Sequence, residues 1–147
     1  MRALGIDLGS KRIGVALSTS DGAMATAYEV VERSRDRVRD HRAIADLAAD
    51  TGAERLVVGL PLSLDGSDGP AATAARAEAD ELAAATGLPV ELWDERLTTV
   101  TADRDLAGAG LDARGRRRVV DKVAAAVMLQ AWLDHRRTAG ATEDLEG

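Results

Sequence analysis

The order of its apolar patterns limits this chain to few folds. Large apolar residues alternate with small or polar ones in three early segments, at residues 3–8, 13–17 and about 24–31. A period of two predicts β-strands, and in the first of them it places Asp7 on the face opposite Leu4, Ile6 and Leu8. The connections at residues 9–12 and 19–22 are short and rich in Gly, Ser and Asp, which favours tight turns. The first part of the chain is therefore predicted to be an antiparallel meander of three strands.

The following segments alternate between helix and strand. Apolar residues at helical spacing end at Gly52, and a buried strand is expected at 56–60. An alanine-rich helix runs to about Thr86 with Gly87 at its end, and a fifth strand covers 90–93. Strand-helix-strand units place their strands parallel. We predict an α/β fold: a five-stranded mixed sheet, with an antiparallel meander plus two parallel strands, flanked by helices. A helix at about 98–106, a linker at 108–110 and a long helix at about 116–137 complete it.

The chain length favours one domain. A chain of 147 residues can bury a substantial core without cross-links, and we expect a single domain over 1–138 followed by an acidic flexible tail over 139–147. There is no cysteine, so a metal ion would be held by oxygen ligands or by the two histidines. No apolar stretch approaches the roughly 20 residues of a membrane span, which predicts a cytoplasmic protein without membrane contact.

The net charge of −6 disfavours nucleic acid as a partner on average, but the basic residues are clustered. Phosphate contacts are predicted for seven of them: Lys11, Arg12, Arg96, Arg116, Arg117, Arg118 and Lys122. Arg96 has the alternative of pairing with Asp94. His41 and His135 stand alone in charged surroundings and are predicted to be surface residues. Because aromatic residues are few, recognition through backbone and shape is favoured over base stacking.

Three acidic positions are unusual: Asp7 inside the first strand, the Asp94-Glu95 pair after the fifth, and Asp121 early in the last helix. If three carboxylates converge to about 4 Å, each pair repels by roughly 4 kcal/mol at an effective dielectric of 20, so a cation or bound protons must offset the charge. Mg²⁺ or Mn²⁺ suits such oxygen ligands and would support phosphodiester hydrolysis. The alternative is that these acids cap turns and helix ends. Glu95 is the preferred ligand, because Asp94 shares the parity of Val90 and Leu92.

Several ordered motifs resemble one family. Residues 5–16 (GIDLGSKRIGVA), 58–62 (VGLPL), 65–67 (DGS), 94–99 (DERLTT) and 120–122 (VDK) are similar to the motifs of the YqgF/RuvX proteins, named as pre-16S rRNA nucleases and Holliday junction resolvases. The resemblance extends to about Asp134. It implies an RNase H-like fold with Asp7, Glu95 and Asp121 as catalytic and metal-binding residues. Ser63 departs from the pattern, where asparagine is expected.

The resemblance implies a metal-dependent nuclease, acting on the 5′ end of pre-16S rRNA in ribosome biogenesis. Two alternatives stay open: a Holliday junction resolvase acting on branched DNA, and a non-catalytic RNA-binding factor in ribosome assembly. Residues 6–10 also resemble the phosphate loop of actin-like ATPases and sugar kinases, but those enzymes need two lobes and this chain is too short for both. No residue decides between RNA and DNA, and a monomer or weak homodimer is expected.

Overall fold

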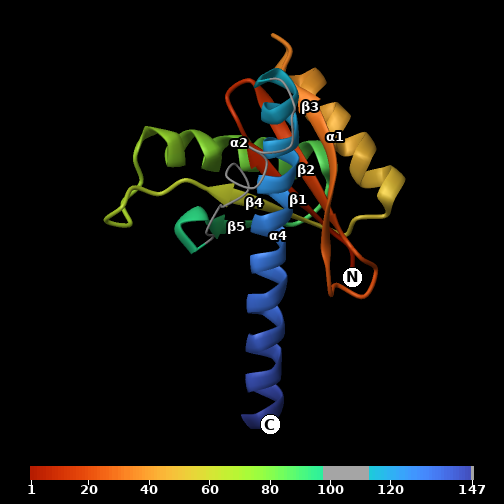
Figure 1. Cartoon of the computed structure of the whole chain (residues 1–147), viewed down its shortest axis with the longest axis vertical. Helices are drawn as coiled ribbons and strands as arrows, with labels where there is room; N and C mark the ends of the chain where they lie inside the picture. The colour runs from red at the N-terminus through yellow and green to blue at the C-terminus, as the bar shows by residue number, and fades with distance from the viewer. Residues whose placement is uncertain (98–112, 147) are drawn as a thin grey trace.

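The computed structural model describes residues 1–97 and 113–146, with side chains over 1–97 and 121–138. These described residues form five strands, three long helices and one short 3-10 helix (Figure 1). In chain order these are β1 (Ala3–Leu8), β2 (Arg12–Ser18), β3 (Ala25–Glu32), α1 (Arg37–Thr51), β4 (Arg55–Leu60), α2 (Pro70–Thr86), β5 (Val90–Asp94), η1 (Glu95–Leu97) and α4 (Ala113–Glu146).

The strands form one mixed sheet in the order β3-β2-β1-β4-β5. β2 pairs antiparallel with both β1 and β3, whereas β4 pairs parallel with both β1 and β5. This confirms the predicted meander with two added parallel strands. Because β1, β4 and β5 run in the same direction, their carboxyl ends lie at one edge of the sheet, where ligands bind in open α/β sheets.

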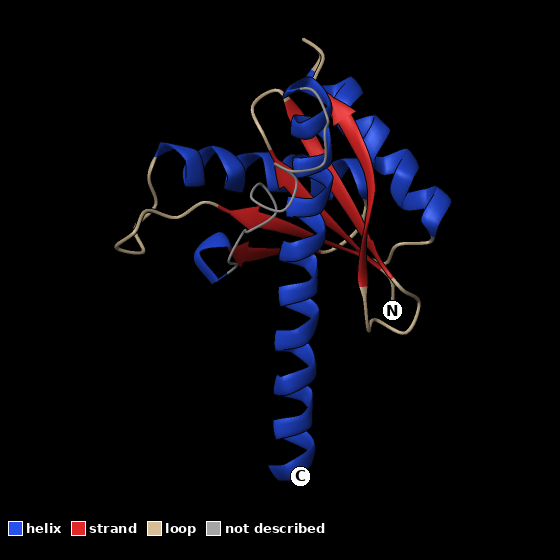
Figure 2. Ribbon diagram, viewed as in Figure 1, coloured by secondary structure: helices blue, strands red, loops and turns tan. Residues whose placement is uncertain are grey.

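The helices cover the sheet on both faces (Figure 2). Leu4 and Ile6 of β1 pack in one core with Ile44 of α1 and Leu82 of α2. Ala3 of the same strand packs with α4 on the opposite face. The alternation along β1 therefore directs odd-numbered residues to α4, as the sequence predicted for Asp7.

Local signals explain where α1 and α2 begin and end. The Asp36 side chain accepts a hydrogen bond from the Arg39 backbone N–H and so caps the start of α1. Gly52 and Gly87 follow α1 and α2 with φ of 71° each, a left-handed conformation that glycine adopts without a steric penalty. Both glycines were the predicted stop positions.

Two glycines allow α4 to lie directly on the sheet. A Cβ atom on Gly14 would stand 2.1 Å from the Asp121 carbonyl oxygen, and one on Gly5 would stand 2.8 Å from the Leu129 Cβ. Neither position admits a side chain without moving the helix. Gly14 pairs with Asp7 across β1 and β2, so this contact also places Asp121 near Asp7.

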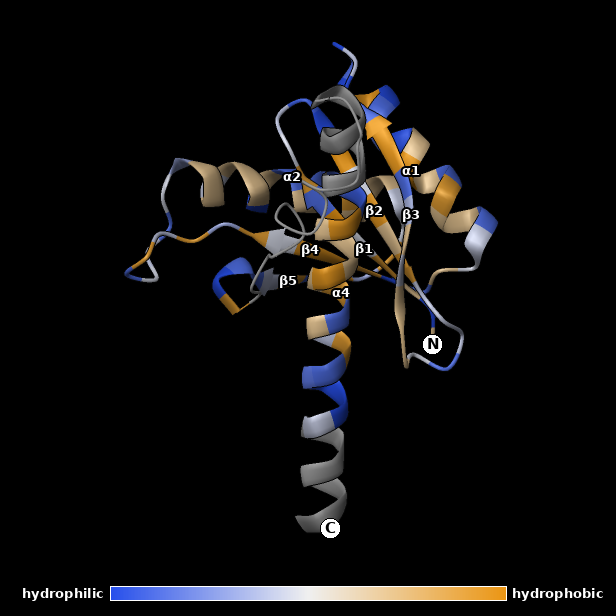
Figure 3. Cartoon of the chain, viewed as in Figure 1, coloured by the Kyte–Doolittle hydropathy of each residue, from blue (hydrophilic) through white to orange (hydrophobic). Residues whose placement is uncertain are grey.

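The last helix is longer than the sequence predicted. It begins at Ala113 and continues to Glu146, so residues 139–146 of the segment assigned to an acidic tail are helical along their backbone, and the predicted end at Arg137 was too early. Acidic residues are not a stop signal, and no proline follows Arg137. Figure 3 shows apolar residues where α4 crosses the sheet and hydrophilic ones in the coloured turns that follow. The predicted helix at 98–106 and linker at 108–110 lie outside the described residues.

None of the described helices combines the length and the apolar composition that a membrane span requires.

Candidate active site

Asp7 is a partly buried carboxylate near the end of β1. Its side chain lies on the α4 face of the sheet, on the same side as Gly5. The pKa of Asp7 is raised from its ordinary value of 3.8 to about 6, first by burial and then by the nearby negative charge of Asp121. Asp7 thus sits where a second carboxylate already disfavours its ionised form.

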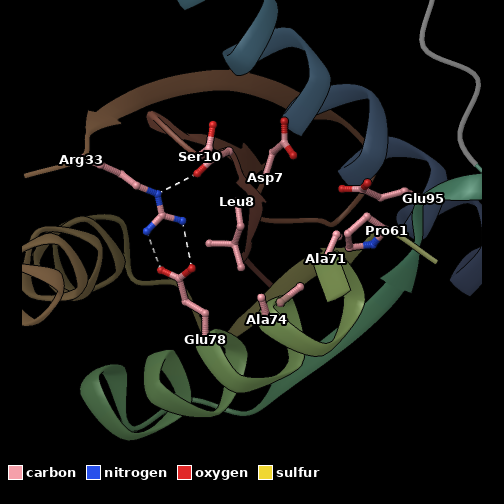
Figure 4. A pocket seen from close by; sticks show the side chains of 12 residues that line it. Asp7, Leu8, Ser10, Arg33, Pro61, Ala71, Ala74, Glu78 and Glu95 are labelled. Carbon is pink, nitrogen blue, oxygen red and sulfur yellow. Dashed lines mark hydrogen bonds and ion pairs between the residues drawn. The ribbon is translucent and has the colours of Figure 1, made fainter. Parts of the chain in front are cut away.

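Glu95 follows β5 and turns back over the sheet. A Cβ atom on Gly59 of β4 would stand 2.4 Å from Glu95 Oε1, so the glycine makes the room that this carboxylate occupies. In Figure 4 the Glu95 carboxylate points toward Asp7. The pKa of Glu95 is raised from 4.5 to about 7, first by burial and then by the negative charges of Asp7 and Asp94.

Asp121 reaches the same edge from α4. Its Oδ2 accepts a hydrogen bond of 2.8 Å from Arg12 Nε, and the Asp121 side chain retains 27% of its exposure. Arg12 was predicted to contact phosphate, and the structure places it as the intramolecular partner of an acid. Sequence reasoning missed this pair, because the two residues are far apart along the chain.

Asp7 is therefore the central member of a set of three acids. It interacts electrostatically with Asp121 on one side and with Glu95 on the other. In the described part of the chain, no three acids or histidines are already gathered closely enough to hold a metal ion. The donor set nevertheless fits a hard divalent cation, because it consists of carboxylate oxygens whose mutual repulsion a cation would relieve.

The Asp94 carboxylate is paired with Arg96. Arg96 Nε and Nη2 both donate to the Asp94 carboxylate, at 3.0 and 2.7 Å from its two oxygens, and the Arg96 backbone N–H donates to it as well. These bonds lower the pKa of Asp94, with the Arg96 side chain as the largest cause. Arg96 also donates to the Leu64 carbonyl oxygen. This geometry favours Glu95 over Asp94 as a ligand.

The remaining basic candidates lie in different surroundings. Lys11 is exposed in the turn between β1 and β2, and Lys122 is partly buried next to Asp121. The side chains of Arg116, Arg117 and Arg118 lie outside the described residues, although the α4 backbone passes through them. Contacts of these residues with phosphate stay a prediction.

A pocket of about 410 Å³ opens beside the acids. Asp7 and Glu95 lie at one end of it, and Arg33 and Glu78 lie at the other (Figure 4). Ser10 and the first turns of α2 line the space between these ends. The acids therefore stand at the edge of a cavity large enough for part of a substrate.

The far end of this pocket is held by a polar network that sequence reasoning missed. Arg33 donates two hydrogen bonds of 2.9 Å to Glu78 and one of 2.7 Å to the Gly9 carbonyl oxygen. His41 Nε2 lies 2.7 Å from Glu78 Oε2. Burial raises the pKa of Glu78, but the bonds from Arg33 and His41 outweigh it and hold that pKa below its ordinary range.

The prediction that His41 is a surface residue was wrong, because only 4% of it is exposed. The usable signal was Glu78, an acid on the apolar stripe of α2 between Ala75 and Leu82, which needs a buried partner. His135, by contrast, is exposed and lies against the Trp93 ring.

The raised pKa values predict how stability depends on pH. A carboxyl group whose pKa is higher in the folded than in the unfolded state makes the folded state bind protons more tightly, so stability falls as pH rises between the two values. For Asp7 this interval is 3.8 to about 6, and for Glu95 it is 4.5 to about 7. We expect the free energy of unfolding of the metal-free protein, measured by urea titration in EDTA, to fall from pH 5 to pH 7.5.

Added Mg²⁺ should restore more stability at pH 7.5 than at pH 5, because the acids are ionised only at the higher pH. The Glu95→Gln variant is the control and should show a flatter pH profile. A free energy of unfolding that rises across this interval in EDTA would contradict the placement of the acids.

Comparisons with known proteins show to which proteins the chain is related. A family model described as "RuvX: Holliday junction resolvase" matches residues 1–135. A protein of Myxococcus xanthus (strain DK1622) named "Putative pre-16S rRNA nuclease" is 47% identical over 137 residues, 93% of this chain and 90% of that protein. One of the same name from Anaeromyxobacter sp. (strain K) is 50% identical over 136 residues, 92% of this chain and 98% of that protein.

Two solved structures share the fold. The Thermus thermophilus RuvC structure superimposes with a TM-score of 0.54 at 18% identity, covering 94% of this chain and 97% of that one. T. thermophilus RuvC in complex with a Holliday junction substrate gives a TM-score of 0.56 at 18% identity, covering 93% and 96% of the two chains. These similarities confirm the predicted RNase H-like fold.

Proposed function

The chain belongs to the RuvX family, and from this premise we propose that it is a nuclease that hydrolyses phosphodiester bonds with a divalent metal ion. One observation carries the proposal. Asp7, Glu95 and Asp121, which come from three separate elements, lie at one edge of the sheet, and the charge of Asp7 is coupled to both of the others. A structural role would not require three partly buried acids of which, among the described residues, only Asp121 has a cationic partner.

The metal ligands are proposed to be Asp7, Glu95 and Asp121, and the ion Mg²⁺ or Mn²⁺. Oxygen donors of this kind suit hard cations, which take up the negative charge that the carboxylates and a substrate phosphate would otherwise share. When bound, the metal supplies Lewis-acid polarisation of the phosphodiester group. The protein's own contribution is to hold the three carboxylates at a fixed edge of a rigid sheet.

Arg12 has a defined task in this proposal. Its guanidinium group keeps the Asp121 carboxylate oriented by the bond of 2.8 Å. The seven basic residues predicted from the sequence, among them Lys11, Arg96 and Lys122, are proposed to contact substrate phosphates around the acids.

Pre-16S rRNA is the first candidate substrate, with cleavage at its 5′ end during ribosome biogenesis in the cytoplasm. The observation that favours it is the name shared by relatives that are 47% and 50% identical over nearly the whole chain. A branched DNA junction is the second candidate, favoured by the description of the matching family model. The working unit is proposed to be one domain over residues 1–138, acting as a monomer or weak homodimer.

A cleavage assay tests the function directly. The purified chain is incubated with a 16S precursor RNA carrying a 5′ extension and, separately, with a four-way DNA junction, in the presence of Mg²⁺, Mn²⁺ or EDTA. We expect metal-dependent cleavage of the RNA and none in EDTA. Stronger cleavage of the junction would favour the second substrate, whereas binding of RNA without cleavage under every condition would favour a non-catalytic assembly factor.

A further inference from the structure

We propose that the pocket beside the acids receives one unstacked nucleoside of the substrate, adjacent to the phosphate that is cut. This inference rests on the proposed nuclease function and deepens it, because it names the form of nucleic acid that the site accepts. An unpaired or flipped-out nucleotide would enter the pocket, whereas a base stacked inside a duplex would not reach it.

The position of the pocket points to this occupant. Asp7 and Glu95 form part of its lining, so a phosphate held at the acids is directly continuous with the cavity. Its volume of about 410 Å³ falls within the range of sites that enclose a small molecule, about 300–1,000 Å³. A substrate strand whose phosphate lies at the acids must therefore place an adjoining group in this space or leave it empty.

The walls of the pocket suit a flat, largely apolar group. Leu8, Pro61, Ala71 and Ala74 line it between the two polar ends (Figure 4). The alanines belong to the first turns of α2, where larger side chains would fill the cavity. No aromatic residue lines the pocket within the described part of the chain, so a base would be enclosed by aliphatic surface instead of being stacked on a ring.

The far end of the pocket carries the guanidinium group of Arg33, which is paired with the Glu78 carboxylate. Among the described residues, Arg33 uses one N–H for the Gly9 carbonyl oxygen and two for Glu78. A guanidinium group carries five N–H groups, and in this proposal the two that Arg33 does not use for Gly9 or Glu78 bind an acceptor of the nucleoside. Glu78 pairs with Arg33 and also lies 3.9 Å from Arg37 Nε, so part of the positive charge at this end is compensated within the protein. This arrangement suits the neutral acceptor edge of a base.

Two leucine substitutions distinguish an effect of filling the pocket from a general effect of changing α2. Ala74→Leu adds bulk to a position that lines the cavity but is exposed to solvent, so the core and the acids are untouched. Ala84→Leu is the matched control, because Ala84 is an exposed residue of the same helix and does not line this pocket. Leucine is nearly as good a helix former as alanine, and both variants should retain the circular dichroism spectrum and melting temperature of the parent chain.

The test compares two RNA duplexes that differ only in one bulged, unpaired nucleotide. We expect the wild-type chain with Mg²⁺ to cleave next to the bulge at least about tenfold faster than it cleaves the fully paired duplex, because the bulge avoids the cost of unstacking. Ala74→Leu should lower the rate of cleavage next to the bulge about tenfold, and Ala84→Leu should leave this rate unchanged. Equal cleavage of the bulged RNA by all three proteins would overturn the proposal.

A binding measurement keeps the inference separate from the nuclease assignment. The bulged nucleotide is replaced by 2-aminopurine, whose fluorescence rises when it leaves the base stack, and the duplex is titrated with the Asp7→Asn protein so that it stays intact. A rise that disappears in the Asp7→Asn/Ala74→Leu protein supports the pocket even if no RNA is ever cleaved. Metal-dependent cleavage without such a rise would reject the pocket and leave the nuclease function standing.

Discussion

Replacing Asp7 by asparagine is expected to remove phosphodiester cleavage while making the metal-free protein more stable at pH 8. A unit charge at about 4 Å from a cation contributes ~4 kcal/mol at an effective dielectric near 20, and its loss corresponds to roughly a thousandfold in rate. The gain in stability arises because wild-type Asp7 is ionised at pH 8 in a buried position beside Asp121. Allowing for its partial exposure, we expect about 1–2 kcal/mol from the rise in its pKa.

Initial cleavage rates with Mg²⁺ and urea titrations in EDTA measure these two effects. Asp46→Asn serves as the control, because Asp46 is an exposed acid on α1, away from the sheet edge. It should change neither quantity. An Asp7→Asn protein that cleaves at more than a tenth of the wild-type rate would show that this carboxylate is not a ligand.

Two adjacent acids should differ sharply when each is replaced by its amide. Glu95→Gln is expected to lower the cleavage rate on the order of a hundredfold or more, because it removes a charge that faces Asp7 and would contact the cation. Asp94→Asn should lower it by less than about fivefold, since Asp94 is paired with Arg96 and exposed ion pairs contribute only about 0–1 kcal/mol.

Rates at saturating Mg²⁺ and the Mg²⁺ concentration at half-maximal activity distinguish the two. For Glu95→Gln the half-maximal concentration should rise, and for Asp94→Asn it should stay near the wild-type value. The opposite ranking would exchange the roles of the two residues and make Asp94 the ligand.

The sheet could be predicted closely because its signals are local. The alternation in residues 3–8 set both the existence of β1 and the face on which Asp7 lies, and the strand-helix-strand order implied the parallel pairing of β1, β4 and β5. The stop positions of α1 and α2 followed from Gly52 and Gly87. Each of these inferences needs only neighbouring residues and backbone geometry.

What could not be predicted depends on packing between distant segments. The sequence indicates that Arg12 is an exposed basic residue beside a turn. Asp121 comes within 2.8 Å of it only because α4 packs directly on Gly14. His41 lies in a charged stretch of sequence, yet α2 covers it and supplies Glu78. The surroundings of a charged residue change when a helix packs over it. The pattern of residues around Arg12 or His41 in the sequence does not indicate which distant acid will pair with it.

The placement of Asp121 on the element that follows all five strands has a consequence during translation. A polypeptide still emerging from the ribosome can form β1 and β5, with Asp7 and Glu95, before α4 has left the exit tunnel. It cannot bring the third acid into place until that helix docks on Gly5 and Gly14. In the proposed function, an unfinished chain is thus unable to cut the messenger or ribosomal RNA that surrounds it, and nuclease activity begins only when synthesis has passed the final helix.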